Sequence, residues 1–339
     1  MKIRLAERWR GNTNRPHTDT SQKGYTAMKK TIAIACAALF TLSLAGCGTS
    51  ASSAGSTASE STASSAATTA ESSASSAEGY RIAIVQQMDH ASLDQIRAAI
   101  EAELDAKAAE QGVAIEYELF NGQNDATTLN QIGTQVITDG YDAIIPIATL
   151  AAQCMANAAA DTETPVIYAA ISDPAAADLT DISYVTGTSD YLDTEFIMEM
   201  MFAANPDIET VGLLYSNSEP NSEAAIEAAK AYLDEKGVAY VEATGNTNDE
   251  VLSAAVNLAD QADAVFTPTD NVIMAAAGAV ATTFTEAGIP YYTGADSFVT
   301  AGALATCGVN YDELGAATAD LALEVLDTGN VPEYQLVPG

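Results

Sequence analysis

The sequence predicts an α/β protein with two doubly wound lobes, each a parallel sheet between two layers of helices. Short apolar runs alternate with amphipathic or Ala-rich segments from Tyr80 to Leu326, which is typical of βα repeats. Polar residues follow almost every apolar run directly, as they do where ligands bind at the carboxyl ends of parallel strands. About ten such repeats are too many for one compact sheet, and two three-layer lobes accommodate them.

The clearest repeat runs from Tyr141 to Pro174. A strand over 143–148 leads to a helix over 149–160 and a strand over 166–170, which ends at Ser172-Asp173-Pro174. Thr149 stands at the helix N-terminus, where free backbone N–H groups favour anions, and Asp173 supplies a negative charge nearby. Each residue also has a purely structural interpretation, because Thr149 suits an N-cap and Asp173-Pro174 suits a turn.

The remaining elements of the first lobe are also predicted from short apolar runs and amphipathic segments. They are the strands 81–85, 115–120 and 183–188 and the helices 93–110 and 126–138. The helix 93–110 carries Leu93, Ile96, Ile100 and Leu104 on one face, at the spacing that predicts a buried stripe.

The second lobe continues the alternation. Its expected helices are 191–205, 221–235, 249–259 and 271–287, and its expected strands are 211–215, 239–243, 264–267 and 290–293. A strand over 304–309 and a helix over 311–326 follow. We place the first lobe at 80–188 plus 302–320, the second lobe at 189–301, and a truncated C-terminal crossing at 321–339.

Two glycines lie beside the expected crossings between the lobes. Gly187 and Gly302 suit a hinge, although a plain turn explains each equally well. We expect the lobes to close on a ligand, with acidic side chains repelling one another across an empty cleft.

The N-terminal segment predicts export. Met28-Lys29-Lys30 and the apolar run 31–44 form a signal peptide, shorter than the roughly 20 residues of a membrane span. Leu44-Ala45-Gly46-Cys47 resembles the lipobox of bacterial lipoproteins, which implies that Cys47 is lipidated. Residues 1–46 are therefore expected to be an extension and signal peptide, with Met28 as the better start. The Ser- and Ala-rich segment 47–79 is expected to be a flexible tether.

The charge of the chain excludes one class of partner. Formal net charge is −33, and eight of the 13 Lys and Arg residues lie in the first 30 positions. The chain from residue 31 onward carries five basic and 44 acidic side chains. Such a surface repels nucleic acid.

Candidate ligand-binding residues lie mainly at or after the carboxyl ends of the predicted strands. They are Gln87, Thr149, Ser172, Asp173, Tyr215, Ser218, Glu219, Asn221, Ser222, Thr269, Asp270, Asn271 and Asp296.

No pattern for catalysis or a cofactor accompanies these residues. The sequence has no Gly-x-Ser-x-Gly elbow, Walker A loop or His- and Cys-rich metal pattern, so we expect neither an enzyme nor a metal or cofactor site. His90, the one histidine of the expected lobes, is interpreted as a loop or hinge residue. Cys154 and Cys307 form either a disulfide or two free thiols.

The residue types at the strand ends favour a zwitterionic ligand. Arg81 starts its strand and Arg97 lies inside a helix, so no arginine clamp for phosphate stands at these ends. A single carboxylate is then held by a helix N-terminus and hydroxyls, and acids such as Asp173 bind an ammonium. Four tyrosines could stack on an aromatic ligand or form core edges: Tyr168, Tyr191, Tyr215 and Tyr311.

Several short segments of the sequence together resemble the ABC-transporter substrate-binding lipoproteins of the tryptophan/tyrosine type, which have a type I periplasmic-binding-protein fold. The segments are Leu93-Asp94, Asn130-Gln131-Ile132, Ala148-Thr149-Leu150-Ala151-Ala152-Gln153, Ser172-Asp173-Pro174, the run from Leu214 to Ser222, Pro268-Thr269-Asp270-Asn271 and Asp312-Glu313-Leu314-Gly315. The family's chain continues past the point where this sequence stops.

The resemblance implies a membrane-anchored solute-binding lipoprotein on the outer side of the cytoplasmic membrane. It would capture an amino acid, with aromatic amino acids among the candidates, between its lobes and deliver it to a permease with an ATPase subunit. Two alternatives stay open on the residues alone: a membrane-tethered ligand sensor, and a binder of a neutral sugar or nucleoside.

Overall fold

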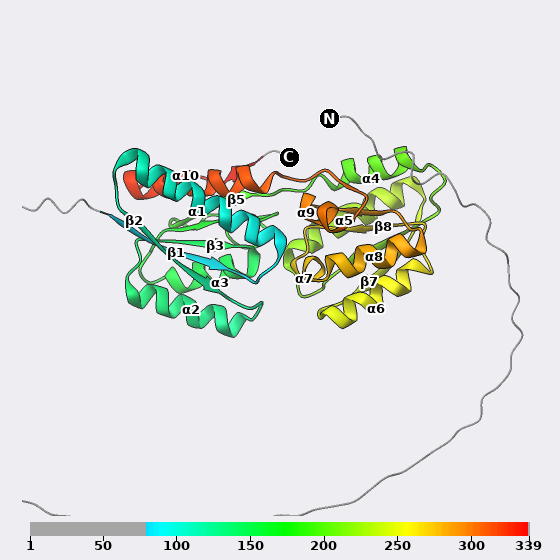
Figure 1. Ribbon diagram of the computed structural model, residues 1–339, viewed down its shortest axis with the longest axis horizontal. Coiled ribbons are helices and arrows are strands. Elements are labelled where there is room, and N and C mark those ends of the chain that lie inside the picture. Colours follow the sequence, from blue (N-terminus) through cyan, green and yellow to red (C-terminus); the bar gives the residue numbers. More distant parts are fainter. Residues whose placement is uncertain (1–78, 338–339) are drawn as a thin grey trace, which may run out of the picture. The chain divides into compact units, whose positions relative to one another are not determined.

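The computed structural model describes residues 79–337. The predictions for the signal peptide, Cys47 and the tether concern residues outside this range. The described chain forms two lobes, each built on an all-parallel sheet with helices on both faces (Figure 1). The predicted fold class is therefore confirmed.

The first sheet has the strand order β2-β1-β3-β4-β5-β11. Its strands are β1 (Tyr80–Gln86), β2 (Ile115–Asn121), β3 (Ala143–Ile147), β4 (Val166–Tyr168), β5 (Val185–Ser189) and β11 (Gln335–Leu336). The apolar run Ile82–Val85 and the whole of β3 are buried, as expected for central strands covered on both faces.

Two pairs of helices cover this sheet. Helices α1 (Ala91–Gln111) and α10 (Tyr311–Thr328) pack together on one face, and α2 (Ala126–Asp139) and α3 (Thr149–Ala159) on the other (Figure 1). The apolar face predicted for the first helix, which includes Leu93 and Ile96, is buried. Chain-distant helices thus form one layer because α10 returns to the first lobe.

The second sheet has the strand order β7-β6-β8-β9-β10. Its strands are β6 (Thr210–Tyr215), β7 (Ala239–Thr244), β8 (Ala264–Thr267), β9 (Tyr291–Thr293) and β10 (Ala305–Thr306). Its helices are α4 (Thr194–Ala204), α5 (Pro220–Lys236), α6 (Asn248–Ala259), α7 (Asn271–Ala275), α8 (Ala277–Ala287) and α9 (Asp296–Ala301). Helix α4 packs with α5, and α6 with α8.

Three local predictions differ from the structure. The single helix expected over 271–287 is broken at Ala276, whose backbone leaves the helical region although alanine is a strong helix former. Helix α9 and strand β11 have no counterpart among the predicted elements, because six and two residues are too few for a periodic signal.

The chain passes between the lobes at two places within the described residues. The first lies between Ser189 and Thr194, and the second between Thr306 and Tyr311. The predicted return to the first lobe at residue 302 is wrong, because β10 still pairs with β9 in the second sheet. The segment 321–336, expected to cross, belongs to the first lobe through α10 and β11.

Neither glycine proposed as a hinge lies at these crossings. Gly187 is inside β5, where the backbone and ring of Tyr168 leave no room for a side chain. Gly302 ends α9 with a φ of 121°, a conformation that favours glycine. Both glycines therefore serve local packing and turn geometry.

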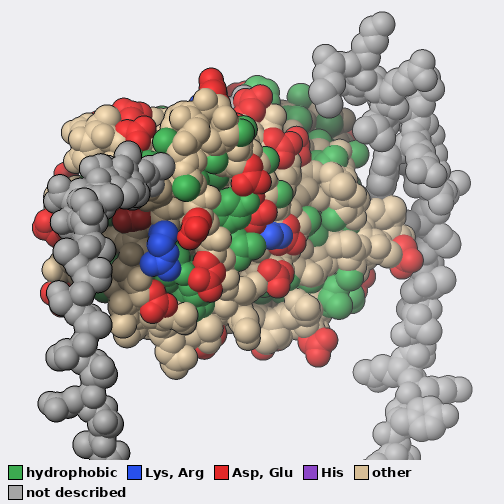
Figure 2. Space-filling model, turned by 60° about the vertical axis from the view of Figure 1, so that its left-hand side comes forward, with side chains coloured by type: hydrophobic (Ala, Val, Ile, Leu, Met, Phe, Trp, Pro, Cys, Tyr) green, Lys and Arg blue, Asp and Glu red, His purple; other side chains and the backbone are tan. Residues whose placement is uncertain are grey.

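The surface of the described chain is strongly acidic. Figure 2 shows Asp and Glu side chains spread over one face, with few Lys and Arg among them. Within residues 79–337 no helix has both the length and the apolar character that a membrane span requires. Cys154 and Cys307 are free thiols, so the structure favours the second of the two alternatives for this pair.

Candidate ligand-binding site

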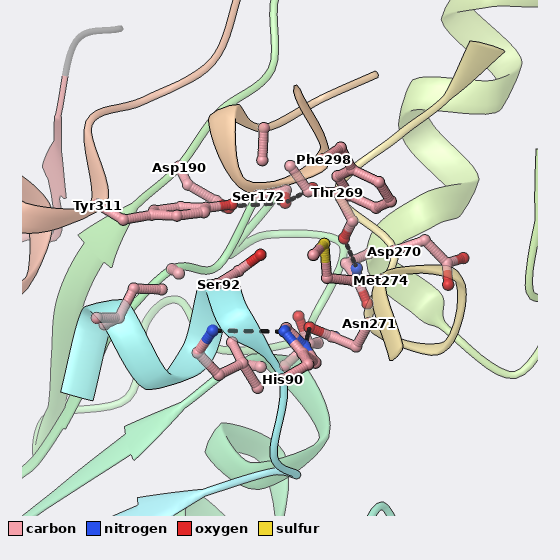
Figure 3. Close-up of a pocket in the computed structure, with 17 residues that line it drawn as sticks. His90, Ser92, Ser172, Asp190, Thr269, Asp270, Asn271, Met274, Phe298 and Tyr311 are labelled. Carbon is pink, nitrogen blue, oxygen red and sulfur yellow. Dashed lines mark hydrogen bonds between the residues drawn. The ribbon is translucent and has the colours of Figure 1, made fainter. Parts of the chain in front are cut away.

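A cavity of about 20 Å³ lies between the two lobes. The first lobe and the crossings contribute His90, Ser92, Leu93, Ile96, Ala148, Thr149, Ala170, Ser172, Asp190 and Tyr311, and the second lobe contributes Asn221, Thr269, Asp270, Asn271, Met274, Ala295 and Phe298 (Figure 3). Much of this lining comes from residues just beyond the carboxyl ends of parallel strands, where the fold class places ligands. Since small-molecule pockets usually hold about 300–1,000 Å³, the lobes must part to admit a ligand.

Six of the predicted site residues line this cavity. They are Thr149, Ser172, Asn221, Thr269, Asp270 and Asn271. The structure therefore brings together residues that lie up to about 120 positions apart in the chain, because the two lobes face each other across the cleft.

Four other predicted residues point elsewhere. Asp173 accepts hydrogen bonds from the backbone N–H groups of Ala175 and Ala176, so it shapes the turn that the sequence also allowed. The Tyr215 hydroxyl donates to Glu242 on the surface. Ser218 and Asp296 are exposed.

The last three predicted residues are buried behind the cavity wall. Ser222 donates to Asp270 Oδ2 at 2.7 Å. Gln87 donates to Glu219 Oε1 at 3.0 Å and accepts from the backbone N–H of Leu150 at 3.0 Å. The bond between Gln87 and Glu219 joins the two lobes, whereas the bond between Ser222 and Asp270 lies within the second lobe.

Asp190 is the acid that the sequence analysis overlooked. It follows β5, on the first crossing, and is 4% exposed. Ser172 Oγ donates to its Oδ1 at 2.9 Å, and the Tyr311 hydroxyl donates to its Oδ2 at 3.3 Å (Figure 3). The rule that selected the other candidates applies to Asp190 as well, since it stands at a strand's carboxyl end.

Burial dominates the ionisation of Asp190. It raises the pKa of the carboxyl group to about 6, and the hydrogen bonds from Ser172 and Tyr311 lower it only in part. No Lys or Arg is among the residues that line the cavity. A ligand with a cationic group would supply the missing counter-charge.

The N-terminus of α3 lies at the same cavity, which Ala148 and Thr149 line. Ala148, at the N-cap position, has φ 76° and ψ 164° and provides no side-chain cap. This conformation is essentially a glycine conformation and costs about 1–3 kcal/mol in other residues. Ala170, another lining residue, also has a positive φ of 60°. Both residues with strained backbone thus lie in the wall of the cavity.

Apolar side chains form another part of the lining. Phe298 and Met274 come from the second lobe, and Leu93, Ile96 and Tyr311 come from the first (Figure 3). Of the tyrosines expected to stack on a ligand, Tyr311 alone lines the cavity, whereas Tyr168 is a core residue and Tyr191 is 66% exposed. The lining thus combines two buried carboxylates, Asp190 and Asp270, with the N-terminus of α3 and an apolar area.

His90 is a cavity residue rather than a hinge. Its Nδ1 accepts from the backbone N–H of Leu93, which caps α1, and its Nε2 faces Asn271 Oδ1 at 3.0 Å. Burial lowers the pKa of its imidazole to about 4, against smaller raising effects of Asn271, Asp94 and Asp89. The ring is therefore neutral at physiological pH.

Four side-chain hydrogen bonds connect the lobes around the cavity. The pairs are His90 with Asn271, Gln87 with Glu219, Ser92 with Ser297, and Ser172 with Thr269. The cleft is thus closed, and the expected repulsion between facing acids does not hold for Asp173 and Asp296, which lie outside it.

A family of known proteins matches this chain. The model of the family described as ABC transporter substrate binding protein matches residues 81–336. The chain belongs to this family. Proteins of the family bind a solute outside the cytoplasm for an ABC transporter, which agrees with the prediction of a solute-binding protein.

Curated and solved relatives of this substrate-binding protein are known. It is 32% identical over 259 residues to the tyrosine-binding protein of Clostridioides difficile strain R20291, covering 74% of each chain. It is 27% identical to a structure of a conserved domain protein from Vibrio cholerae O1 biovar El Tor, with a TM-score of 0.72 over 77% of this chain and 90% of the other.

Two further structures differ in how well they superpose. The L-Trp complex of a Streptococcus pneumoniae ABC domain is 30% identical, with a TM-score of 0.71 over 77% of this chain and 90% of the other. A ligand-free, open substrate-binding protein with adhesive properties from Clostridium difficile is 31% identical, with a TM-score of 0.58 over 76% and 89%. At equal identity, the lobe arrangement of this substrate-binding protein resembles the ligand complex more than the open form.

Proposed function

We propose that this substrate-binding protein captures an aromatic amino acid in the cleft between its lobes and delivers it to the permease of an ABC importer. The observation that carries the proposal is Asp190, a buried carboxylate without a cationic partner among the cavity-lining residues. An α-ammonium group placed there gains a charge-assisted hydrogen bond, which is about twice as strong as a neutral one.

The carboxylate of the ligand has its own candidate position. The N-terminal turn of α3 offers the backbone N–H of Thr149 and the positive end of the helix dipole, whereas the N–H of Ala148 donates to the Ala169 carbonyl and that of Leu150 to Gln87. Without Lys or Arg in the lining, this helix N-terminus suits one carboxylate and not a phosphate group. Asn221 Oδ1, a buried acceptor without a protein partner, adds a second acceptor for the ligand's N–H groups.

The side chain of the ligand would contact the apolar part of the lining. Phe298 and Tyr311 offer ring faces, and Met274 offers a polarisable sulfur, all of which favour aromatic groups. The relatives described as tyrosine-binding and as an L-Trp complex support the same ligand class.

The test is isothermal titration calorimetry of the full chain with L-tyrosine, L-tryptophan and L-phenylalanine. We expect at least one of them to bind at micromolar concentration or tighter. Tyramine, which lacks the carboxylate, and 3-(4-hydroxyphenyl)propionate, which lacks the ammonium, should bind far more weakly. Binding of a neutral sugar or nucleoside, with no response to any amino acid, would contradict the proposal.

We further propose that Cys47 anchors this protein to the outer side of the cytoplasmic membrane and that the permease works with an ATPase subunit. Cys47 follows a signal-like run and precedes a Ser- and Ala-rich segment, and two or more acyl chains give stable anchoring. We expect Cys47→Ser to move the protein from the membrane fraction to the soluble extracytoplasmic fraction. The same substitution at Cys36 serves as the control, and an unchanged distribution of the Cys47 variant would refute lipidation.

A further inference from the structure

Glu219 is a buried carboxyl group at the contact between the lobes. It is 4% exposed and occupies the N-cap position of α5 in the second lobe. Its Oε1 accepts a hydrogen bond from Gln87 Nε2 of the first lobe at 3.0 Å, and its Oε2 accepts one from Asn271 Nδ2 at 2.6 Å. Closure of the cleft therefore removes this group from water.

The hydrogen-bond directions around Glu219 are determined by backbone groups. The N–H of Leu150 donates to Gln87 Oε1, which leaves Gln87 Nε2 to donate to Glu219 and to Asn124. Asn271 uses its Nδ2 for Glu219, so its Oδ1 accepts from His90 Nε2. The other imidazole nitrogen of His90 accepts from a backbone N–H of α1, so a proton added there would face another donor. The network thus requires a neutral His90.

Within residues 79–337, no cation is among the groups that act on Glu219. The charged group that acts on it is Asp270, which has the same sign. Its partners from the first lobe are neutral: Gln87, which also contacts Asn124 and Leu150, and His90 through Asn271. Asp89 and Asp94 act on His90, and Asp94 pairs with Arg97. The α5 N-terminus favours the ionised carboxylate, but burial and Asp270 act against it.

We propose that Glu219 and His90 form a proton-controlled latch, which closes the lobes when Glu219 is protonated and His90 is neutral, and opens them when Glu219 loses its proton. The latch itself is a property of the lobes alone. Its consequence for the ligand, release as pH rises, rests on the proposed function. On closing, one proton passes from solvent to a carboxyl oxygen of Glu219.

The ionisation of the two groups gives the pH window. Burial, with Asp270, raises the pKa of Glu219 from 4.5 to about 8, and burial lowers the pKa of His90 from 6.5 to about 4. Between pH 4.5 and about 8, closing of the lobes therefore takes up a proton at Glu219. Between about pH 4 and pH 6.5, closing releases a proton from His90. The closed form is weakened as pH rises toward 8, while below pH 6.5 the two proton transfers largely offset each other.

Two other buried acids, Asp270 and Asp190, lie close to Glu219 or to the ligand cavity. Burial raises the pKa of Asp270, which acts together with Glu219. Asp190 faces the ligand cavity and changes its ionisation near pH 6. Because it is already about half ionised there, it alters affinity by at most about twofold between pH 6 and pH 8.

The first test needs no ligand. Small-angle X-ray scattering of the full chain at pH 6 and pH 9 should show a larger radius of gyration at pH 9. Glu219→Gln, which does not titrate, should keep at both pH values the smaller radius of gyration that the wild-type protein has at pH 6. An equal radius of gyration of the wild-type protein at both pH values, or the same expansion in the variant, would overturn the latch.

The second test uses L-tyrosine in calorimetry at pH 6 and pH 8. From the two pKa changes, wild-type affinity should fall about tenfold over this interval, while that of Glu219→Gln should rise about fourfold, because only His90 then responds. The same slope in both proteins would refute the role of Glu219. If L-tyrosine binds to neither protein at either pH, the proposed ligand is wrong, and the scattering result still decides on the latch.

Discussion

Replacing Asp190 with Asn is expected to weaken L-tyrosine binding by about thirtyfold or more. Truncating or neutralising one partner of a buried charge pair costs about 2–5 kcal/mol, and each 1.4 kcal/mol corresponds to about tenfold in affinity. Asn keeps the size of Asp190, and its carbonyl oxygen still accepts from Ser172 or Tyr311. The loss therefore reports the charge that faces the ligand's ammonium group.

The control for this variant is Asp173→Asn. Asp173 precedes the turn beside the same cleft, but its carboxylate accepts from the backbone of that turn and does not line the cavity. We expect its affinity for L-tyrosine to stay within about threefold of wild type, because Asn also suits such turns. Calorimetry of both variants, with circular dichroism to verify folding, is the measurement. Equal affinity of Asp190→Asn and wild type would remove Asp190 from the site.

Replacing Gly187 with Ala destabilises the first lobe strongly. A Cβ atom at this position in β5 would overlap with the carbonyl oxygen and the ring of Tyr168 on β4. Tyr168 is completely buried, so its ring has no free space to move into. Overpacking usually costs about 1–3 kcal/mol, and an overlap with backbone belongs at the upper end.

Thermal unfolding measures this effect. At about 2–4 °C per kcal/mol for a chain of this size, Gly187→Ala should lower the melting temperature by about 6–12 °C. Gly278→Ala is the matched control, because a Cβ atom there meets no heavy atom within 4 Å and alanine favours the helix α8. Its melting temperature should stay equal or rise. A Gly187 variant as stable as the control would show that the strand shifts freely at this position.

The sequence by itself determined the fold class and most of the elements. The apolar runs at Ile82–Val85 and in β3 predicted central strands, and the stripe that includes Leu93 and Ile96 predicted the buried face of α1. These features depend on local periodicity, which each segment carries alone. Helix breaks, such as the break at Ala276, and very short elements produce no periodic pattern in the sequence.

The sequence also located the site at the carboxyl ends of the strands, but it did not select the residues within those ends. Asp173 and Asp190 both follow first-lobe strands, yet one shapes a turn and the other lines the cavity. Glu219 was expected to face the ligand, and the structure places it between Gln87 and Asn271 instead.

The reason is that a residue at a strand end has no periodicity to orient it. Its direction depends on the turn that follows and on what the opposite lobe presents, as in the bonds of Gln87 to Glu219 and His90 to Asn271. These partners lie 132 and 181 positions apart in the chain. Sequence periodicity therefore specified the two sheets and their helices, whereas the packing of one lobe against the other decided which acids are buried, which are paired and which line the cavity.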